Sequence, residues 1–452
     1  MPVSLLYLGL MLLVIVVWFV LVKRPVYEAV LLSFIVLLFV TGTWGNVWSY
    51  IDAALSTSLL YSMVAFVAMS VLLTRTKIVD SCIAVILSLI GRLRGGAGYT
   101  AVIASAFMGA LSGSGPGNVM ATGAITIPAM KRSGFPPELA ANIESNASYL
   151  GNLIPPSSNI VAALGVFAAV YPNTELTTGQ FWMVLWGISI WFILQRLIMV
   201  WGFCKYYKVK PMEKGELPSL KETIKEGWQG LLIPVIILLP FILDYLFKSN
   251  FFTERLGENG AKYFSSSILL FIGGIASIYT CFVVKDKDSV KIHNLAKMFG
   301  GAVKTIAPSI GVCVFGYMIG SLFSDLNVAE DLGKVIAAWQ FGKFGTVVAV
   351  CAITCFMGMV IPGSSLVVIF GGMFITVLVN AGCDPLLSAA MLPCICGVMC
   401  GITPPLGLGM YAGMTLAESD FYKTFKNDLW WVSAQFTLQV LILMGWLPVF
   451  GL

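Results

Sequence analysis

The stretch SGSGPGNVMATGAITIPAMKRSGFPPELAANIESNASYLGNLIPPSSNIV, residues 112–161, decides the fold of this chain. Small and apolar residues dominate it, yet the glycine-rich run 112–118 and the double proline Pro155–Pro156 interrupt it. Glycine weakens a helix, and proline lacks the N–H that the carbonyl four residues earlier needs. The stretch therefore predicts apolar helices with fixed breaks, whose exposed backbone groups must be sheltered by the rest of the fold.

Composition places these helices in a membrane. Of 452 residues, 58% are hydrophobic and 11% are charged, whereas a soluble domain carries about 25% charged residues. The net charge of +5 does not indicate nucleic-acid binding, because the basic residues lie in loops between apolar stretches. We therefore expect an all-α polytopic membrane protein.

Ten stretches are long and apolar enough to cross a bilayer: 5–22, 27–44, 57–74, 136–170, 180–203, 228–247, 263–284, 303–323, 385–416 and 429–449. The turn at 23–26 carries Lys23 and Arg24, and the 205–227 loop carries six lysines, so the positive-inside rule makes both cytoplasmic. Loops 45–56 and 171–179 contain no Lys or Arg and are expected outside. Arg196, near the cytoplasmic end of its helix, is expected to snorkel. Both termini are then periplasmic, in a bacterial inner membrane.

Two further apolar segments do not fit as crossings. Residues 98–130 have basic residues at both ends, so both ends favour the cytoplasm and the segment is expected to be a re-entrant helical hairpin. Residues 346–381, with MVIPGSS at their centre, are its counterpart on the outer side. The shorter segments 77–94 and 328–342, which precede the hairpins, are expected to be interfacial arm helices.

The two halves of the chain resemble each other at one offset. Residue numbers differ by 249 between Gly109 and Gly358, between Pro136 and Pro385, and between the two double prolines. We predict an inverted repeat of two five-crossing halves, 1–204 and 228–452, each with a hairpin and a discontinuous helix (136–170 and 385–416). Such repeats are typical of secondary transporters, which bind their cargo where the repeats meet. The alternative is chance similarity between two apolar sequences.

The double prolines predict where binding groups lie. Pro155–Pro156 free the carbonyls of Gly151 and Asn152, and Pro404–Pro405 free those of Cys400 and Gly401. Freed carbonyls at membrane depth are ligands for Na⁺, and half-helix N-termini can hold an anionic group. The alternative is a simple kink at each pair. The candidate substrate-binding residues are Asn118, Asn152, Ser157 and Ser365.

Glu144 is a carboxylate inside a predicted crossing, and it is a candidate for proton or ion coupling. The competing interpretation is a polar contact with Asn142, Asn146 or Arg132. The ten cysteines have no histidine near them, since the single His293 lies in a loop. We therefore expect no metal site beyond Na⁺, no cofactor and no enzymatic activity.

Residues 112–161 and ITPPLGLGMYAGMTLAESDFYKTF (402–425) resemble the two signature regions of the large membrane subunit of tripartite ATP-independent periplasmic (TRAP) transporters. The resemblance implies a Na⁺-driven, elevator-type importer of small organic acids. It also implies two partners, a small membrane subunit and a periplasmic substrate-binding protein. The implied ion-binding residues are Ser112, Ser114, Gly151, Ile154 and Pro156 in the first half, and Gly363, Ser364, Cys400, Thr403 and Pro405 in the second.

This sequence departs from the family pattern at Gly115–Pro116–Gly117 in the first tip, and Cys400 stands where the first half has Gly151. A stand-alone ion-coupled carrier or Na⁺/H⁺ antiporter of the wider ion-transporter superfamily, without a binding protein, is the main alternative. A membrane enzyme would need a nucleophile–base spacing that this sequence lacks. A channel fits symmetric hairpins and broken helices less well.

Overall fold

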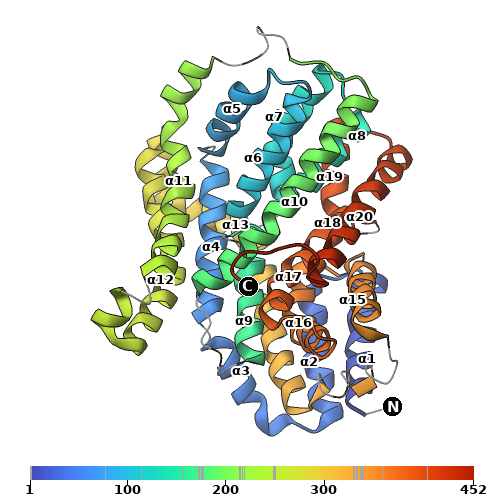
Figure 1. The fold of residues 1–452 in the computed structure, drawn as a ribbon. Helices are drawn as coiled ribbons and strands as arrows, with labels where there is room; N and C mark the ends of the chain where they lie inside the picture. The colour runs from blue at the N-terminus through green and yellow to red at the C-terminus, as the bar shows by residue number, and fades with distance from the viewer. Residues whose placement is uncertain are drawn as a thin grey trace.

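The computed structural model describes residues 3–56, 58–76, 78–112, 115–155, 157–171, 174, 178–212, 215, 217, 219–247, 251–328, 331, 334–335, 341–359, 361–404 and 406–452. Within these residues every regular element is helical and no strand is present (Figure 1). The all-helical class predicted from composition is therefore confirmed. The helices vary widely in length, because several apolar segments are interrupted by 3₁₀ or π turns.

The helices of the first half lead from the N-terminus to the long helix α10. They are α1 (Val3–Val16), η1 (Val17–Leu21), α2 (Val26–Thr41), η2 (Trp44–Asn46), α3 (Val47–Leu55), α4 (Ser58–Arg75), α5 (Ile78–Ile90), α6 (Gly96–Ser112), α7 (Gly115–Arg132), α8 (Pro137–Tyr149), η3 (Leu150–Asn152), α9 (Ser158–Val170) and α10 (Thr178–Tyr206).

The helices of the second half follow in a comparable order. They are α11 (Leu220–Phe247), α12 (Thr253–Val283), η6 (Lys287–Val290), α13 (Ile292–Asp325), α15 (Gly342–Gly358), α16 (Gly363–Asn380), α17 (Pro385–Leu392), η7 (Pro393–Val398), α18 (Met399–Ile402), α19 (Leu408–Ala417) and α20 (Phe421–Leu443). Most of the predicted arm 328–342 lies outside the described residues.

Residues 45–56, which the charge count indicated as a loop, are largely helical. Helix α3 buries Tyr50 and Ala54, one turn apart, and packs against α13. The Tyr50 hydroxyl donates to Asp325 Oδ2 at 2.8 Å, and its ring meets Phe34 edge-on. The prediction of a loop was wrong because an absence of basic residues sets the side of the membrane and says nothing about backbone conformation.

Four described helices are long and apolar enough to cross a membrane: Thr178–Tyr206, Gly227–Asp244, Gly363–Asn380 and Pro385–Ile402. The bent pair Trp44–Leu55 and Leu60–Arg75, at 52°, would make a fifth. Other predicted crossings are divided between shorter helices, as where α1 passes into the π turn η1. The ten-crossing topology stays a prediction.

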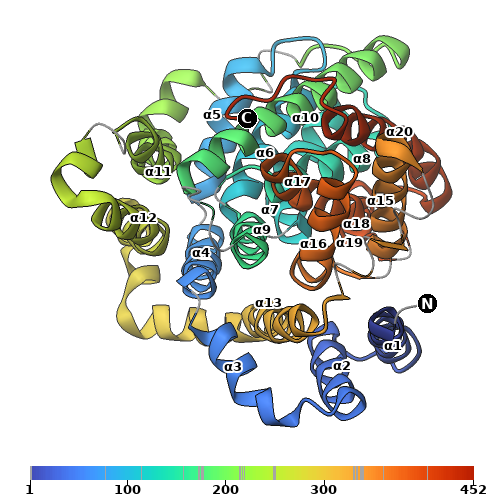
Figure 2. The same ribbon diagram turned by 60° about the horizontal axis from the view of Figure 1, so that its bottom comes forward.

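The segments predicted to be hairpins and broken helices form one packed cluster. Helices α6, α7 and α8 pack on one another, and α16 packs on α15, α17 and η7. Helix α9 packs on α16, and α19 packs on α7, so each half's late helix lies on the other half's hairpin. Figure 2 shows α11 and α12 away from this cluster, with α1, α2, α3 and α13 along another side.

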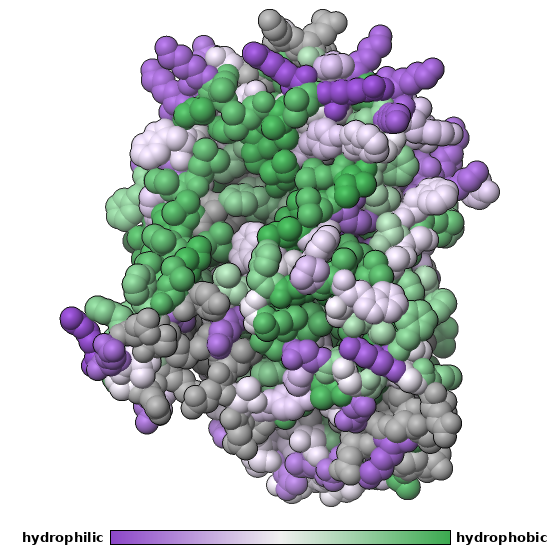
Figure 3. All heavy atoms as spheres, viewed as in Figure 1, coloured by the Kyte–Doolittle hydropathy of each residue, from purple (hydrophilic) through white to green (hydrophobic). Residues whose placement is uncertain are grey.

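The surface fits a lipid environment. In Figure 3, apolar side chains cover the middle of the visible face and polar side chains gather at its two ends. Large apolar side chains recur with helical spacing on α12, where Phe271, Ile275 and Ile278 are exposed. An apolar face of this extent is costly in water and favourable in lipid.

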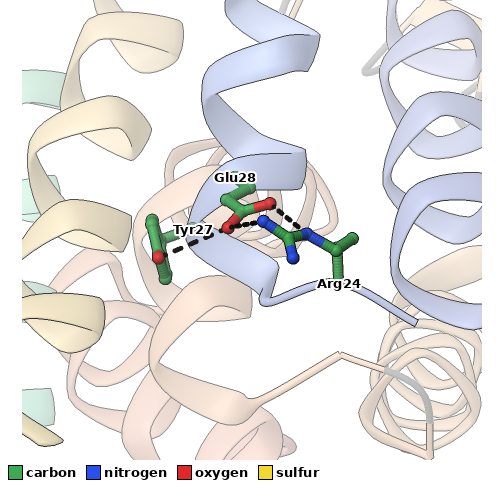
Figure 4. Close-up of polar contacts among 3 residues, drawn as sticks. All are labelled: Arg24, Tyr27 and Glu28. Atoms are coloured by element: carbon green, nitrogen blue, oxygen red, sulfur yellow. Dashed lines mark hydrogen bonds and ion pairs between the residues drawn. The ribbon is translucent and has the colours of Figure 1, made fainter. Parts of the chain in front are cut away.

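The turn between α1 and α2 is held by an ion pair (Figure 4). Arg24 Nε donates to Glu28 Oε2 at 2.9 Å and Arg24 Nη2 donates to Oε1 at 3.0 Å, while the Tyr27 hydroxyl lies 3.4 Å from Oε1. This two-pronged geometry orients the first turn of α2. Because the Arg24 side chain is exposed, the pair contributes little to stability.

Candidate functional site: two helix breaks and their hairpins

The first break follows α8. The η3 turn ends at Asn152, and the Leu153 and Ile154 N–H groups both bond to the Leu150 carbonyl, at 3.0 and 3.2 Å. Ser157 is extended, and α9 starts one residue later. The Ser157 hydroxyl donates to the Asn152 carbonyl at 3.0 Å, so one of the two carbonyls predicted to be freed by the prolines accepts from a side chain.

The second break follows α18. Thr403 is extended and Gly407 is left-handed, with φ of 31°. The Leu406 N–H donates to the Met359 carbonyl at 3.0 Å, so the break is bonded to the end of the second hairpin's first helix. The Thr403 hydroxyl donates to the Met399 carbonyl at 2.7 Å. Each break lies beside one of the two double prolines of the sequence.

Each break touches its hairpin at a glycine. A Cβ on Gly151 would lie 2.5 Å from the Gly109 oxygen and closer still to its Cα and carbonyl carbon, so only glycine fits there. In the second half, Gly358 faces Cys400, whose Cβ would lie 3.1 Å from an added Cβ. Cys400 Sγ accepts from the Gly363 N–H at 3.2 Å and donates to the Gly397 carbonyl at 3.1 Å. Gly358 and Cys400 are the counterparts of Gly109 and Gly151 at the repeat offset.

The first break also touches the π turn η7, which precedes the second break in the chain. Asn152 Nδ2 donates to the Gly397 carbonyl at 3.1 Å, which joins η3 to η7. The buried ring of Tyr149 lies against the Cα positions of Gly115, Gly401 and Gly409, none of which could carry a Cβ without meeting it. Residues from both halves are therefore gathered at one place. Tyr149 was not predicted from the sequence. Its only indication there is the set of three glycines, Gly115, Gly401 and Gly409, whose lack of a side chain makes room for the ring.

The predicted site residues are distributed as follows. Gly151, Ile154, Asn118, Asn152 and Ser157 are buried around the first break. Gly363, Cys400, Thr403 and Ser365 are buried around the second, and Ser364 is half-buried. Ser114, Pro156 and Pro405 lie outside the described residues, and for Ser112 only the backbone, at the end of α6, is described. The ion-binding and substrate-binding roles stay predictions.

Glu144 is fully buried on α8, facing the first hairpin. Ser105 Oγ donates to Glu144 Oε1 at 2.6 Å and Ser148 Oγ at 2.9 Å, and the Thr122 and Thr126 hydroxyls also donate to the carboxylate. The competing interpretation, a polar contact with Asn142, Asn146 or Arg132, was wrong, because the four hydroxyl groups are its hydrogen-bond partners. The carboxyl group links α6, α7 and α8.

A second buried polar network joins α8, α10 and α20. Asn142 and Asn146 donate to Asp428 Oδ1 at 3.2 and 2.9 Å. Arg196 is fully buried and donates to Gln195 and Gln435. The expectation that Arg196 snorkels was wrong, because α20 supplies a polar partner inside the protein. The signal in the sequence is the one-face spacing of Asp428, Gln435 and Gln439 in an apolar stretch. Among the described residues, no three His, Cys, Asp or Glu side chains are grouped to hold a metal.

Interrupted apolar helices beneath an apolar surface are typical of helical membrane transporters. The family model described as "Tripartite ATP-independent periplasmic transporter, DctM component" matches residues 8–450. The chain therefore belongs to the DctM family of TRAP transporter large permeases, which are secondary transporter subunits of the inner membrane and are not enzymes.

Individual relatives support this assignment. The C4-dicarboxylate TRAP transporter large permease DctM of Pseudomonas aeruginosa is 26% identical over 370 residues, 80% of this chain and 78% of that protein. DctM of Vibrio cholerae is 24% identical over 407 residues, 85% of this chain and 84% of that protein. Among solved structures, MtrF of Neisseria gonorrhoeae, described as one of a class of antimetabolite efflux pumps, matches with a TM-score of 0.66 at 13% identity, over 92% of this chain and 86% of that one. The YdaH transporter of Alcanivorax borkumensis matches with a TM-score of 0.56 at 15% identity, over 87% of each chain. These two likenesses concern the fold alone.

Proposed function

We propose that this chain translocates a small organic acid into the cell by Na⁺-coupled, elevator-type alternating access. The observation that carries the proposal is the meeting of the two halves beside the helix breaks: Asn152 of the first break donates to the Gly397 carbonyl in η7, and the Tyr149 ring lies against Gly401 and Gly409, which flank the second break. Backbone carbonyls released by such breaks are oxygen ligands of the kind Na⁺ prefers, and half-helix N-termini are suited to an anion. The substrate class follows the names of several relatives, which include C4-dicarboxylate, sialic acid and isethionate transporters.

An inverted repeat is part of the proposal. The tip-to-break contact of Gly109 with Gly151 has a counterpart in Gly358 with Cys400, each shifted by the same offset. The exchange of packing, α9 on α16 and α19 on α7, fits two halves that interlock about a pseudo-two-fold axis. The hairpins and broken helices would move as one body against the remaining helices, with ion sites at the residues named above for each half.

The proposed orientation places the α10–α11 connection in the cytoplasm and the α9–α10 connection outside. It is tested by cysteine substitution at exposed positions, Lys208 for the first and Thr174 for the second. An impermeant maleimide should label Thr174→Cys in intact cells and Lys208→Cys only after permeabilisation. Labelling of Lys208→Cys in intact cells would show that the α10–α11 connection is outside and that the proposed orientation is wrong.

The proposed partners are a small membrane subunit and a periplasmic substrate-binding protein. One relative, the isethionate TRAP transporter permease DctMQ of Oleidesulfovibrio alaskensis, is matched over only 52% of its length, so it carries a large additional region. Co-purification of this chain with its two candidate partners tests the assembly. Full uptake by this chain alone would favour the stand-alone carrier.

The coupling is tested in proteoliposomes with both partners and labelled C4-dicarboxylates, sialic acid and isethionate. An inward Na⁺ gradient should drive accumulation of one of these acids, and a K⁺ gradient of equal size should not. Uptake driven equally by either gradient would reject Na⁺ coupling.

A further inference from the structure

The Glu144 carboxyl group lies among hydroxyl groups that belong to neither proposed Na⁺ site. It lies in a pocket with Ser105, Thr122, Thr126 and Ser148, all of which are buried. The pocket contains four hydroxyl groups and no basic side chain. A buried carboxylate without a cation partner is costly, and proteins commonly avoid that cost by taking up a proton.

Charged groups on the elements around α8 are engaged elsewhere or lie near helix ends. Lys131 donates to the Ala417 carbonyl, Asp428 accepts from Asn142 and Asn146, and Arg196 donates to Gln195 and Gln435. The remaining titratable side chains on α8 and the elements packed against it are Tyr99, Arg132, Glu138, Tyr149, Cys204, Lys205, Tyr206, Cys394, Cys396, Cys400, Tyr411, Tyr422, Lys423 and Lys426. In the described part of the chain, none of these groups forms an ion pair or hydrogen bond with Glu144.

The hydroxyl groups can satisfy two charge states. Thr122 Oγ1 lies 2.8 Å from the Asn118 carbonyl as well as near the carboxylate, and Thr126 Oγ1 lies 3.0 Å from the Thr122 carbonyl. When Glu144 is ionised, the hydroxyls donate to it. When it is protonated on Oε2, that O–H can donate to Thr126, whose own proton turns to the Thr122 carbonyl. Neither state leaves a buried donor without an acceptor.

The spacing suits a proton better than a metal ion. Ser105 Oγ lies 2.6 Å from Glu144 Oε1 and 2.8 Å from Thr122 Oγ1, which are hydrogen-bond distances. Oxygen ligands stand about 2.3–2.6 Å from a cation the size of Ca²⁺, so neighbouring ligands lie farther apart than hydrogen-bonded oxygens. Moreover, the second half has no equivalent: Pro393 replaces Glu144 at the repeat offset, and Gly371 replaces Thr122.

We propose that Glu144 is a proton-binding site, separate from the Na⁺ sites and joined by hydrogen bonds to the first hairpin near its tip. The link to the tip is Asn118, near the start of α7, which donates to the Ser105 carbonyl at 2.8 Å and the Ser148 carbonyl at 3.4 Å. The Asn118 carbonyl also accepts from Thr122 Oγ1 at 2.8 Å, so the start of α7 and the carboxyl group share one hydrogen-bond network. The statement that this site is separate from the Na⁺ sites rests on the proposed function. Proton binding by Glu144 does not.

The test is an infrared titration of the purified complex in lipid nanodiscs. A protonated carboxylic acid has its own carbonyl band, and Glu144→Gln should remove one that appears as pH falls. Thr126→Val keeps the shape and deletes one hydroxyl that stabilises the anion. The midpoint of the band should therefore move upward by about one to two pH units. Thr354→Val is the matched control, because Thr354 is the buried counterpart of Ser105 and donates to the Val350 carbonyl; its titration should equal that of wild type.

Asp428→Asn removes the other buried carboxyl group of this region, so that its infrared band cannot be mistaken for that of Glu144. The Glu144 band should persist in this variant. The proposal is overturned if the band survives in Glu144→Gln, if Glu144 stays in one charge state across the pH range in which the protein is folded, or if Thr126→Val leaves the midpoint unchanged. Should Glu144→Gln fail to fold, the Thr126→Val shift still decides. If the band titrates as expected but uptake ignores Na⁺, the proposed coupling fails and the proton site stands.

Discussion

Replacing Gly151 by alanine should separate the first break from its hairpin. The added Cβ would lie 2.5 Å from the Gly109 oxygen and closer to two other backbone atoms of that residue. These atoms belong to α6 and cannot rotate away, so α6 or η3 must shift. Overpacking of this kind costs about 1–3 kcal/mol, and we expect the upper end of that range because backbone atoms are the obstacle.

Two other glycines calibrate the effect. At Gly358, the counterpart of Gly109, an added Cβ meets Cys400 Cβ at 3.1 Å, so a displacement of a few tenths of an ångström suffices and about 1 kcal/mol is expected. At Gly202, exposed on α10, nothing lies within 4 Å, and alanine should stabilise the helix by about 0.5–1 kcal/mol.

The assay is thermal loss of monodisperse protein in detergent, followed by fluorescence-detected gel filtration at matched expression. The order of stability should be Gly202→Ala, wild type, Gly358→Ala and then Gly151→Ala. Uptake should fall most in Gly151→Ala, since the carbonyl of that residue is a proposed ion ligand. A Gly151→Ala protein as stable and as active as Gly202→Ala would show that the close approach of α6 to the break is not real.

Three further changes test neighbouring features. Tyr149→Ala should cost about 3–5 kcal/mol by leaving a cavity between the breaks, whereas Tyr149→Phe keeps the ring and should cost only about 1–3 kcal/mol for the hydrogen bond that the Gly409 N–H makes to the phenol oxygen. Asp428→Ala should cost about 1–3 kcal/mol, because it leaves the Asn142 amide without its acceptor, whereas Asn146 Nδ2 still donates to the Asn142 carbonyl at 3.0 Å; a melting temperature equal to that of wild type would mean that the Asn142 amide finds another partner. The double substitutions Pro155→Ala with Pro156→Ala, and Pro404→Ala with Pro405→Ala, should leave the protein folded or stabilised, because proline within a helix costs about 3 kcal/mol. Na⁺-dependent uptake should nevertheless be lost, and wild-type uptake in both would mean that the breaks are ordinary kinks.

Helix breaks and turn-backs are features that a sequence can predict, because their causes are local; the re-entrant hairpins stay predictions. A double proline interrupts a helix wherever it lies, and a glycine-rich run between basic flanks indicates a turn-back. The α3 helix could not be found by counting charges, because its evidence is a buried face, Tyr50 and Ala54, that becomes meaningful only against α13. In the same way, the buried state of Arg196 depends on Gln435, which is far away in the sequence.

The candidate site shows the same division. Sequence identified Asn152 and Cys400 as neighbours of their breaks, but the contact of Asn152 with the Gly397 carbonyl joins residues of different halves. Glu144 was recognisable as an intramembrane carboxylate, whereas its hydroxyl partners come from three helices and depend on how the hairpin packs. Pairing across helices is set by packing, which a single sequence does not display.

Simultaneous measurement of sodium flux and substrate flux is the sharpest test of Na⁺-coupled transport by this chain. Proteoliposomes containing this chain and both proposed partners would be supplied from outside with radioactive sodium and a labelled organic acid that the complex transports. We expect the two fluxes to be strictly linked, with more than one Na⁺ carried per substrate, and the Pro155–Pro156 and Pro404–Pro405 double substitutions to abolish both together. Substrate accumulation without sodium movement would contradict this coupling.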